Sequence, residues 1–282
     1  MGLIAVVSAK GSPGVSTLAL ELVRRHPRDV VGVELDPSGG SWALRHDLSW
    51  DPGLVSLAAT PAPMTVEAAL EHGQRVGRGG VAICASPFAD QVRASLELVE
   101  QRLVSWSDSL DGVLDVGRFD PCVLGVLRRC MVTLVVTRTR VEDVGQLQRL
   151  AETLRLAGVD ARMVAVGSEQ YSPRDIAREV RLPLVDVTIP FTGRAKVWDR
   201  AYQTITDTVA AFTAVSSVQP ATVTGFGLSL QRHSRHEHDR HEHDGHEHDG
   251  HEHEERHHDG SYEAAPATVD GLAHDPGPGG WS

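Results

Sequence analysis

The sequence predicts an α/β fold with a doubly wound, mostly parallel sheet, followed by a disordered C-terminal tail. Three observations predict it. Short apolar runs alternate with helical patterns, the first run leads through a loop of small residues into an apolar helix, and this alternation stops after about residue 217. Strands that are apolar along their whole length, each followed by a helix, are typical of parallel sheets covered on both faces.

The apolar runs give seven expected strands, and the segments between them give six expected helices. The strands are Leu3–Ser8, Val30–Leu35, Val81–Ala85, Gly112–Val116, Met131–Thr137, Arg162–Val166 and Leu184–Ile189. The helices lie near 16–25, 64–76, 90–107, 141–157, 173–181 and 198–215. Because ligands of such folds bind at the carboxyl ends of the strands, the loops that follow the strands are where a site is expected.

The C-terminal part of the chain has a different composition. A unit beginning His-Glu-His repeats from His236, and the last residues are rich in glycine, proline and alanine. Such a segment buries too little apolar surface to offset the entropy of the chain. We therefore expect an ordered domain over 1–217 and a disordered His/Asp/Glu-rich tail over 218–282.

The tail holds eleven histidines between His233 and His258, often two residues apart with carboxylates between them. Imidazole nitrogens at this spacing could bind Ni²⁺ or Zn²⁺. Expansion of a repeat in a solvated acidic tail produces the same pattern, so a metal-handling role remains one of two interpretations.

Charge and composition narrow the class of protein. The formal net charge is −11, but residues 232–259 hold ten acidic residues and four arginines, and residues 260–282 add three acidic residues. The body of the chain, 1–231, is therefore close to neutral. It therefore shows no strong nucleic-acid signal. No apolar stretch reaches the roughly 18–20 residues that span a bilayer, so there is no membrane signal either. Three cysteines without a CxxC pair suit a reducing compartment, and we expect a cytoplasmic protein.

The loop after the first strand runs from Ser8 to Thr17. Backbone N–H groups of a small-residue loop that leads into a helix form an anion-binding nest. Gly11 and Gly14 allow a tight turn and close approach of the backbone to a ligand. Ser16 stands where a hydroxyl would bind Mg²⁺. The loop therefore predicts a phosphate site.

The sequence of this loop, KGSPGVST over 10–17, resembles the deviant Walker A box of the ParA/MinD-like (SIMIBI class) P-loop ATPases. Two further segments resemble that family in the right order. Glu34–Pro37 is similar to its DxDP element, and Asp111–Asp115 is similar to its Walker B strand. The resemblance covers about residues 1–215. It implies ATP and Mg²⁺ as cofactors, a homodimer with nucleotide at its interface, and a protein partner recruited by the nucleotide-bound state.

The resemblance also implies roles for single residues. Lys10 matches the signature lysine, which reaches a nucleotide across the dimer interface, and Asp36 matches the acid that positions the attacking water; these are the expected catalytic residues. Ser16, Asp36 and Asp115 would hold or orient Mg²⁺. The expected cofactor-binding residues are Lys10, Gly11, Ser12, Pro13, Gly14, Val15, Ser16, Thr17 and Asp115.

The loop departs from the family pattern most seriously at Val15, which replaces the lysine inside the loop. That lysine places a positive charge against the β- and γ-phosphates, where electrostatic stabilisation is the main catalytic contribution. Binding could survive its loss through backbone N–H groups and Mg²⁺, whereas hydrolysis is expected to be weak or absent. Arg118 could reach a phosphate and partly replace the charge, although we favour the interpretation of a solvated surface arginine.

The function that the resemblance implies is spatial organisation of the cell, in chromosome partitioning, septum placement or polar and pilus positioning. Two alternatives remain open at this stage. One is a non-enzymatic scaffold related to the degenerate ATPases of pilus assembly. The other is a metal-handling P-loop protein that uses its His-rich tail.

Overall fold

The computed structural model of the chain describes residues 2–11, 13–60, 65–103, 106, 111–167, 169–190 and 195–216. All of them belong to one compact unit, Met1–Val223. Ser12 of the predicted phosphate loop, residue 217 and the predicted tail over 218–282 lie outside the described residues, so the expectations for them stay predictions.

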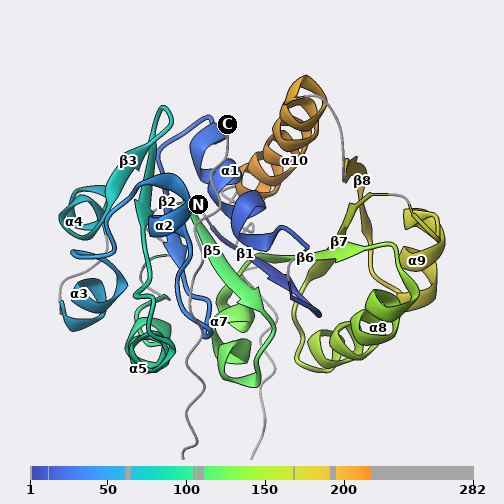
Figure 1. Cartoon of the computed structure of the whole chain (residues 1–282), viewed down its shortest axis with the longest axis horizontal. Coiled ribbons are helices and arrows are strands. Elements are labelled where there is room, and N and C mark those ends of the chain that lie inside the picture. The colour runs from blue at the N-terminus through green and yellow to red at the C-terminus, as the bar shows by residue number, and fades with distance from the viewer. Residues whose placement is uncertain are drawn as a thin grey trace, which may run out of the picture. The chain divides into compact units, whose positions relative to one another are not determined.

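The described strands form one sheet in the order β3-β4-β2-β5-β1-β6-β7-β8 (Figure 1). All neighbouring pairs are parallel except β3 and β4, which are antiparallel at one edge. This confirms the doubly wound, mostly parallel α/β sheet. The strands are β1 (Leu3–Ser8), β2 (Val30–Glu34), β3 (Gln74–Val76), β4 (Gly80–Ile83), β5 (Asp111–Arg118), β6 (Val132–Arg138), β7 (Ala161–Val166) and β8 (Leu184–Ile189).

Helices cover both faces of the sheet, so the central strands bury side chains on both sides. One face packs against α1 (Val15–Arg25) and α10 (Ala195–Ser216), which lie side by side in Figure 1, together with Trp42 from α2 (Trp42–His46). The other face packs against α3 (Leu54–Ala59), α4 (Val66–His72), α5 (Ala89–Glu100), η1 (Pro121–Val123), α7 (Leu124–Arg129), α8 (Val141–Leu156) and α9 (Pro173–Val180).

All seven predicted strands are present, with ends shifted by one or two residues at most. The helix predicted over 64–76 is wrong in its second half. Helix α4 ends at His72, Gly73 adopts an extended conformation, and residues 74–76 form β3 along β4. Pairing with the sheet edge therefore outweighs the local helical pattern. The helix predicted over 90–107 is interrupted: α5 ends at Glu100 and a turn follows at Gln101 and Arg102. Leu103 and Trp106 are helical again, and 104, 105 and 107 lie outside the described residues.

The order of the central strands gathers the predicted site residues at one edge of the sheet. Strand β5 lies between β2 and β1, so Asp115 is in register with Glu34 on one side and Val6 on the other. A register shift after Val6 then brings Arg118 beside Ser8, the last residue of β1. The carboxyl ends of the three strands meet where the phosphate loop begins.

Candidate functional site

A pocket of about 400 Å³ lies where the loop after β1 meets the first turn of α1. Seven of the predicted site residues line it, contributed by the loop, by α1 and by the segment after β2. The structure thus brings the phosphate loop and Asp36 together, as the sequence predicted. The lining residues are Ser8, Gly11, Pro13, Gly14, Val15, Ser16, Thr17, Asp36, Ser38, Ser41, Arg45, Gly117 and Arg118.

The N-terminus of α1 faces this pocket without a side-chain cap. Gly14 is the N-cap residue, with φ 102° in the left-handed region that glycine adopts readily, and it has no side chain to accept a hydrogen bond. The first N–H groups of a helix have no partner inside the helix, and the helix dipole adds positive potential there. The loop therefore presents donors suited to an anion such as phosphate.

Val15 is the first residue of α1, and only 5% of its surface is exposed. It belongs to the core cluster that α1 forms with the sheet, which includes Leu18 and Val6. An aliphatic side chain at this position therefore adds to the packing of the helix on the sheet. It supplies no charge to the pocket.

Lys10 lies outside the set of pocket-lining residues. Its Nζ is 3.7 Å from Oδ1 of Asp143, in the first turn of α8, while 43% of the lysine side chain remains exposed. Lys10 is therefore not positioned to neutralise a ligand in its own pocket. Its predicted role across a dimer interface is not tested by a single chain.

Asp36 lines the pocket and is half-buried. Its Oδ1 accepts a hydrogen bond of 2.8 Å from the backbone N–H of Ser38. Burial raises the pKa of its carboxyl, and the hydrogen bonds from Ser38 oppose this shift. Gly117, with φ 65°, packs against the carboxyl so closely that a Cβ there would collide with it. The position of Asp36 thus depends on glycine at 117.

Asp115 is fully buried behind the pocket. Its Oδ1 accepts a hydrogen bond of 3.1 Å from the N–H of Gly117, and its Oδ2 has no hydrogen-bond partner. Burial raises the pKa of Asp115 to about 8, with a further contribution from the charge of Glu34, and the nearby Ser16 hydroxyl opposes the shift. A buried carboxyl oxygen without a hydrogen-bond partner is energetically costly, and this one belongs to a residue predicted to hold or orient Mg²⁺.

Glu34, which the sequence indicated only as part of a motif, organises one wall of the site. Its fully buried carboxyl accepts hydrogen bonds from the backbone N–H groups of Ser41 at 2.5 Å, Trp42 at 2.9 Å and Ala85 at 3.1 Å. It therefore fixes the start of α2 against the end of β4. Burial is the main influence on its pKa, which is raised.

Trp42 links α2 to the phosphate loop. Its indole is fully buried, and its Nε1 donates a hydrogen bond of 3.1 Å to the carbonyl oxygen of Ser16. The first turn of α1 and the helix that follows β2 are thus joined directly. Arg45, one helical turn further along α2, lines the same pocket as the loop.

Two arginines therefore reach the pocket. The sequence allowed two interpretations of Arg118, and the structure places this residue in the pocket lining. Arg45, which also lines the pocket, was not among the residues predicted from the sequence. A five-residue helix such as α2 carries too few turns to show a hydrophobic period, so no sequence signal could have placed Arg45 there.

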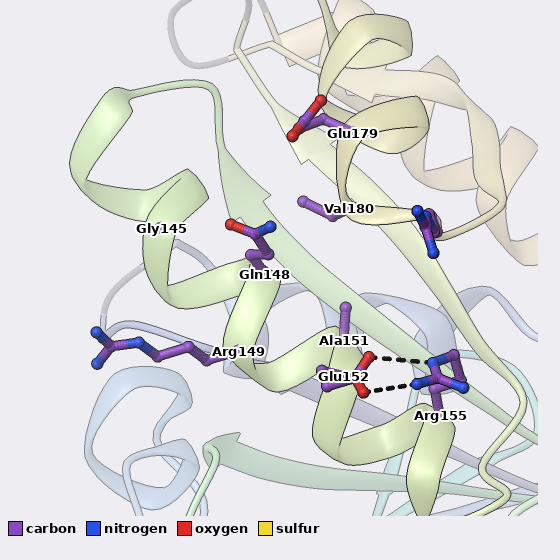
Figure 2. A pocket seen from close by; sticks show the side chains of 9 residues that line it. Gly145, Gln148, Arg149, Ala151, Glu152, Arg155, Glu179 and Val180 are labelled. Carbon is purple, nitrogen blue, oxygen red and sulfur yellow. Dashed lines mark hydrogen bonds and ion pairs between the residues drawn. The ribbon is translucent and has the colours of Figure 1, made fainter.

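A second, larger pocket of about 800 Å³ lies between α8 and α9 (Figure 2). None of the predicted site residues lines it. Its charged side chains include Glu152 and Arg155, which pair with each other on α8 at 2.6 and 3.1 Å, as well as Arg149 and Glu179. With charges of both signs and no convergent polar group, this groove offers no evident chemistry, and the candidate site remains the pocket at α1.

Among the described residues, no group of three or more histidine, cysteine, aspartate or glutamate side chains is arranged to hold a metal ion. None of the described helices combines the length and the apolar character needed to cross a membrane.

No protein-family profile matches the chain, and no curated protein is significantly similar to it in sequence. Solved structures, in contrast, match its fold. The cell division ATPase MinD of Pyrococcus furiosus superposes with a TM-score of 0.59 at 18% identity, covering 75% of this chain and 99% of that one. A ParA family ATPase from Chlorobium tepidum gives 0.54 at 13% identity, covering 76% and 98%.

The septum site-determining protein MinD of Pyrococcus horikoshii, complexed with Mg-ADP, gives a TM-score of 0.55 at 15% identity, covering 76% of this chain and 98% of that one. At these identities the likeness concerns the fold, and the match extends over nearly the whole of each solved chain. The described domain has the fold of the ParA/MinD-like P-loop ATPases.

Proposed function

Starting from this shared fold, we propose that the protein is a ParA/MinD-like nucleotide-binding protein that positions other components of the cell, with weak or absent ATP hydrolysis. The processes that fit are chromosome partitioning, septum placement and polar or pilus positioning. The nucleotide-bound state would form a homodimer and recruit a protein partner.

One observation carries the proposal: the loop of 10–17, the uncapped start of α1 and Asp36 surround one pocket at the carboxyl edge of a ParA/MinD-like sheet. A volume of about 400 Å³ lies within the usual range for small-ligand pockets. A similar MinD is complexed with Mg-ADP, which supports ATP and Mg²⁺ as the ligands of this chain.

The residues present fit a magnesium nucleotide in part. Backbone N–H groups at Gly14 and the start of α1 would hold phosphate oxygens, and Ser16 would contribute a hydroxyl to Mg²⁺. The unpartnered Oδ2 of Asp115 is an acceptor for a proton of metal-bound water. Mg²⁺ commonly uses one or two protein groups plus substrate phosphates, so a ready-made cluster of carboxylates is not required. When bound, the ion would neutralise phosphate charge.

This chain lacks the lysine charge that would stabilise the transition state of ATP hydrolysis. Val15 contributes packing in place of a charge, and Lys10 is paired with Asp143 on α8. Asp36 is left to orient water beside phosphates that no lysine of its own loop stabilises. Because removing a preorganised charge from a transition state commonly costs a factor of 10²–10³ in rate, turnover is expected to be slower than in an intact relative by about that factor.

Binding and turnover can be measured separately. A ligand that binds the folded state raises the melting temperature once its concentration exceeds Kd. We expect Mg·ATP to raise the melting temperature of the full chain and adenosine to leave it unchanged. Turnover is compared with that of MinD from Pyrococcus furiosus, under the same conditions, and with that of Asp36→Ala of this chain.

No shift at millimolar Mg·ATP would favour a non-enzymatic scaffold and refute nucleotide binding. Turnover equal to that of the intact relative, lost in Asp36→Ala, would instead refute the claim of weak hydrolysis. Sedimentation of the chain with and without Mg·ATP tests the homodimer, since the proposal requires the sedimenting mass to double when nucleotide binds.

A further inference from the structure

The pocket at α1 contains two arginines that no loop motif predicts, Arg45 and Arg118. We propose that these two guanidinium groups are the phosphate-binding cations of the site and take over the charge that Val15 removed. The inference rests on the proposed nucleotide binding and names the side chains that recognise the polyphosphate.

The charged side chains that line the pocket are more often basic than acidic. Of the residues that line it, only Asp36, Arg45 and Arg118 have charged side chains. The two arginines outnumber the single acid. The described lining is therefore net positive even though it contains no lysine, which suits an anionic ligand.

Neither Arg45 nor Arg118 has an ion pair among the described residues. Several other arginines of this domain are paired with acids, such as Arg25 with Glu21 and Asp199, and Arg93 with Asp120. Arg45 and Arg118 are exposed at the pocket instead. Their donors are available to a ligand, and a guanidinium can bind phosphate oxygens with two N–H groups at once.

Both arginines belong to segments that are hydrogen-bonded to the phosphate loop or its flanking residues. Arg118 is in register with Ser8, and the next residue, Phe119, donates its N–H to the carbonyl oxygen of Ser8 at 2.8 Å. Arg45 lies on α2, which the indole of Trp42 joins to the carbonyl oxygen of Ser16. The two side chains thus belong to separate segments of the chain, and a hydrogen bond joins each segment to one end of the phosphate loop.

The matched experiment compares Arg45→Ala, Arg118→Ala and the double variant with Arg149→Ala. Arg149 is an exposed arginine of the separate groove on α8, shown in Figure 2, so it controls for loss of one charge. Binding of Mg·ATP, Mg·ADP and adenosine is measured by isothermal titration calorimetry on the full chain, and thermal unfolding confirms that each variant folds.

We expect Kd for Mg·ATP to rise about tenfold in each single variant and by more in the double variant, a tenfold change being about 1.4 kcal/mol. Arg149→Ala should bind Mg·ATP as the original chain does. Arg118→Lys should recover only part of the affinity, because an ammonium keeps the charge and loses the planar fork.

If the original chain binds Mg·ATP and both alanine variants bind it equally well, the arginine proposal is wrong and nucleotide binding stands. The same conclusion follows if Arg149→Ala weakens binding as much as they do, since the effect would then be general electrostatics. If the original chain binds no Mg·ATP, both the proposed function and this inference fail.

Discussion

Replacing Glu34 by alanine should destabilise the domain more than any change at an exposed acid. The carboxyl of Glu34 accepts three backbone hydrogen bonds, and two of the donors, Trp42 and Ala85, are in buried surroundings. Each buried N–H left without a partner costs about 1–3 kcal/mol, whereas water can reach the partly buried N–H of Ser41. Two such groups give an expected loss of about 2–6 kcal/mol in the free energy of unfolding.

The assay is urea-induced unfolding at pH 7 of the original chain, Glu34→Ala and Glu21→Ala. Glu21 is the matched control, because it is an acid of α1 that pairs with Arg24 and Arg25 near the surface and should cost at most about 1 kcal/mol. The reasoning about Glu34 would be refuted if the two alanine variants unfolded at the same urea concentration. A change in the slope of the transition would show instead that the unfolded or native state had altered.

Three further predictions concern the same edge of the sheet. Burial raises the pKa of Asp115 to about 8 in the nucleotide-free fold, while the unfolded chain loses this proton near pH 4. Stability should therefore fall by about 1.4 kcal/mol per pH unit between pH 5 and 7, and less steeply towards pH 8. Urea unfolding of Asp115→Asn across this range should lack that slope. Gly117→Ala should lower the free energy of unfolding by about 1–3 kcal/mol, because residue 117 has a left-handed φ and a Cβ there would collide with Asp36. Gly145→Ala is the control, since a Cβ at this position of α8 meets open space, and its thermal unfolding should show no loss of stability. Val15→Lys should raise ATP turnover and lower the free energy of unfolding by about 1–3 kcal/mol, because core packing is lost. Val15→Ala should lose stability without the gain in turnover. Equal turnover in the two variants would contradict the role assigned to the missing lysine.

The strands were predictable because a short, continuous run of apolar residues indicates a buried strand whichever segments it packs against. Val30–Glu34 and Val132–Arg138 are apolar through most of their length, and burial on both faces selects such runs. The phosphate loop was predictable for a similar reason, since small residues between a strand and a helix permit few conformations. Both follow from local chemistry, which a single sequence contains.

The rest depends on contacts between distant segments. Residues 74–76 join the sheet because β4 offers an unpaired edge, a fact that their own sequence does not carry. The place of Arg45 in the pocket lining depends on α2, whose Trp42 donates a hydrogen bond to Ser16, 26 residues earlier in the chain. The raised pKa of Asp115 likewise requires Glu34 in the neighbouring strand. Candidate residues of the site could therefore be predicted from the sequence, whereas the contacts between distant segments that bring them together could not.

The two edges of the described sheet bear on how copies of this chain can associate. At one edge β3 is only three residues long, and it runs against its neighbour. At the other edge β8 exposes Asp186 and Thr188 and pairs with β7 through an irregular register. Short, charged or kinked edges discourage the addition of a further strand. Self-assembly by extending the sheet is therefore disfavoured, and any oligomer should form through loops and helix faces, where a small ligand can govern whether the surfaces meet.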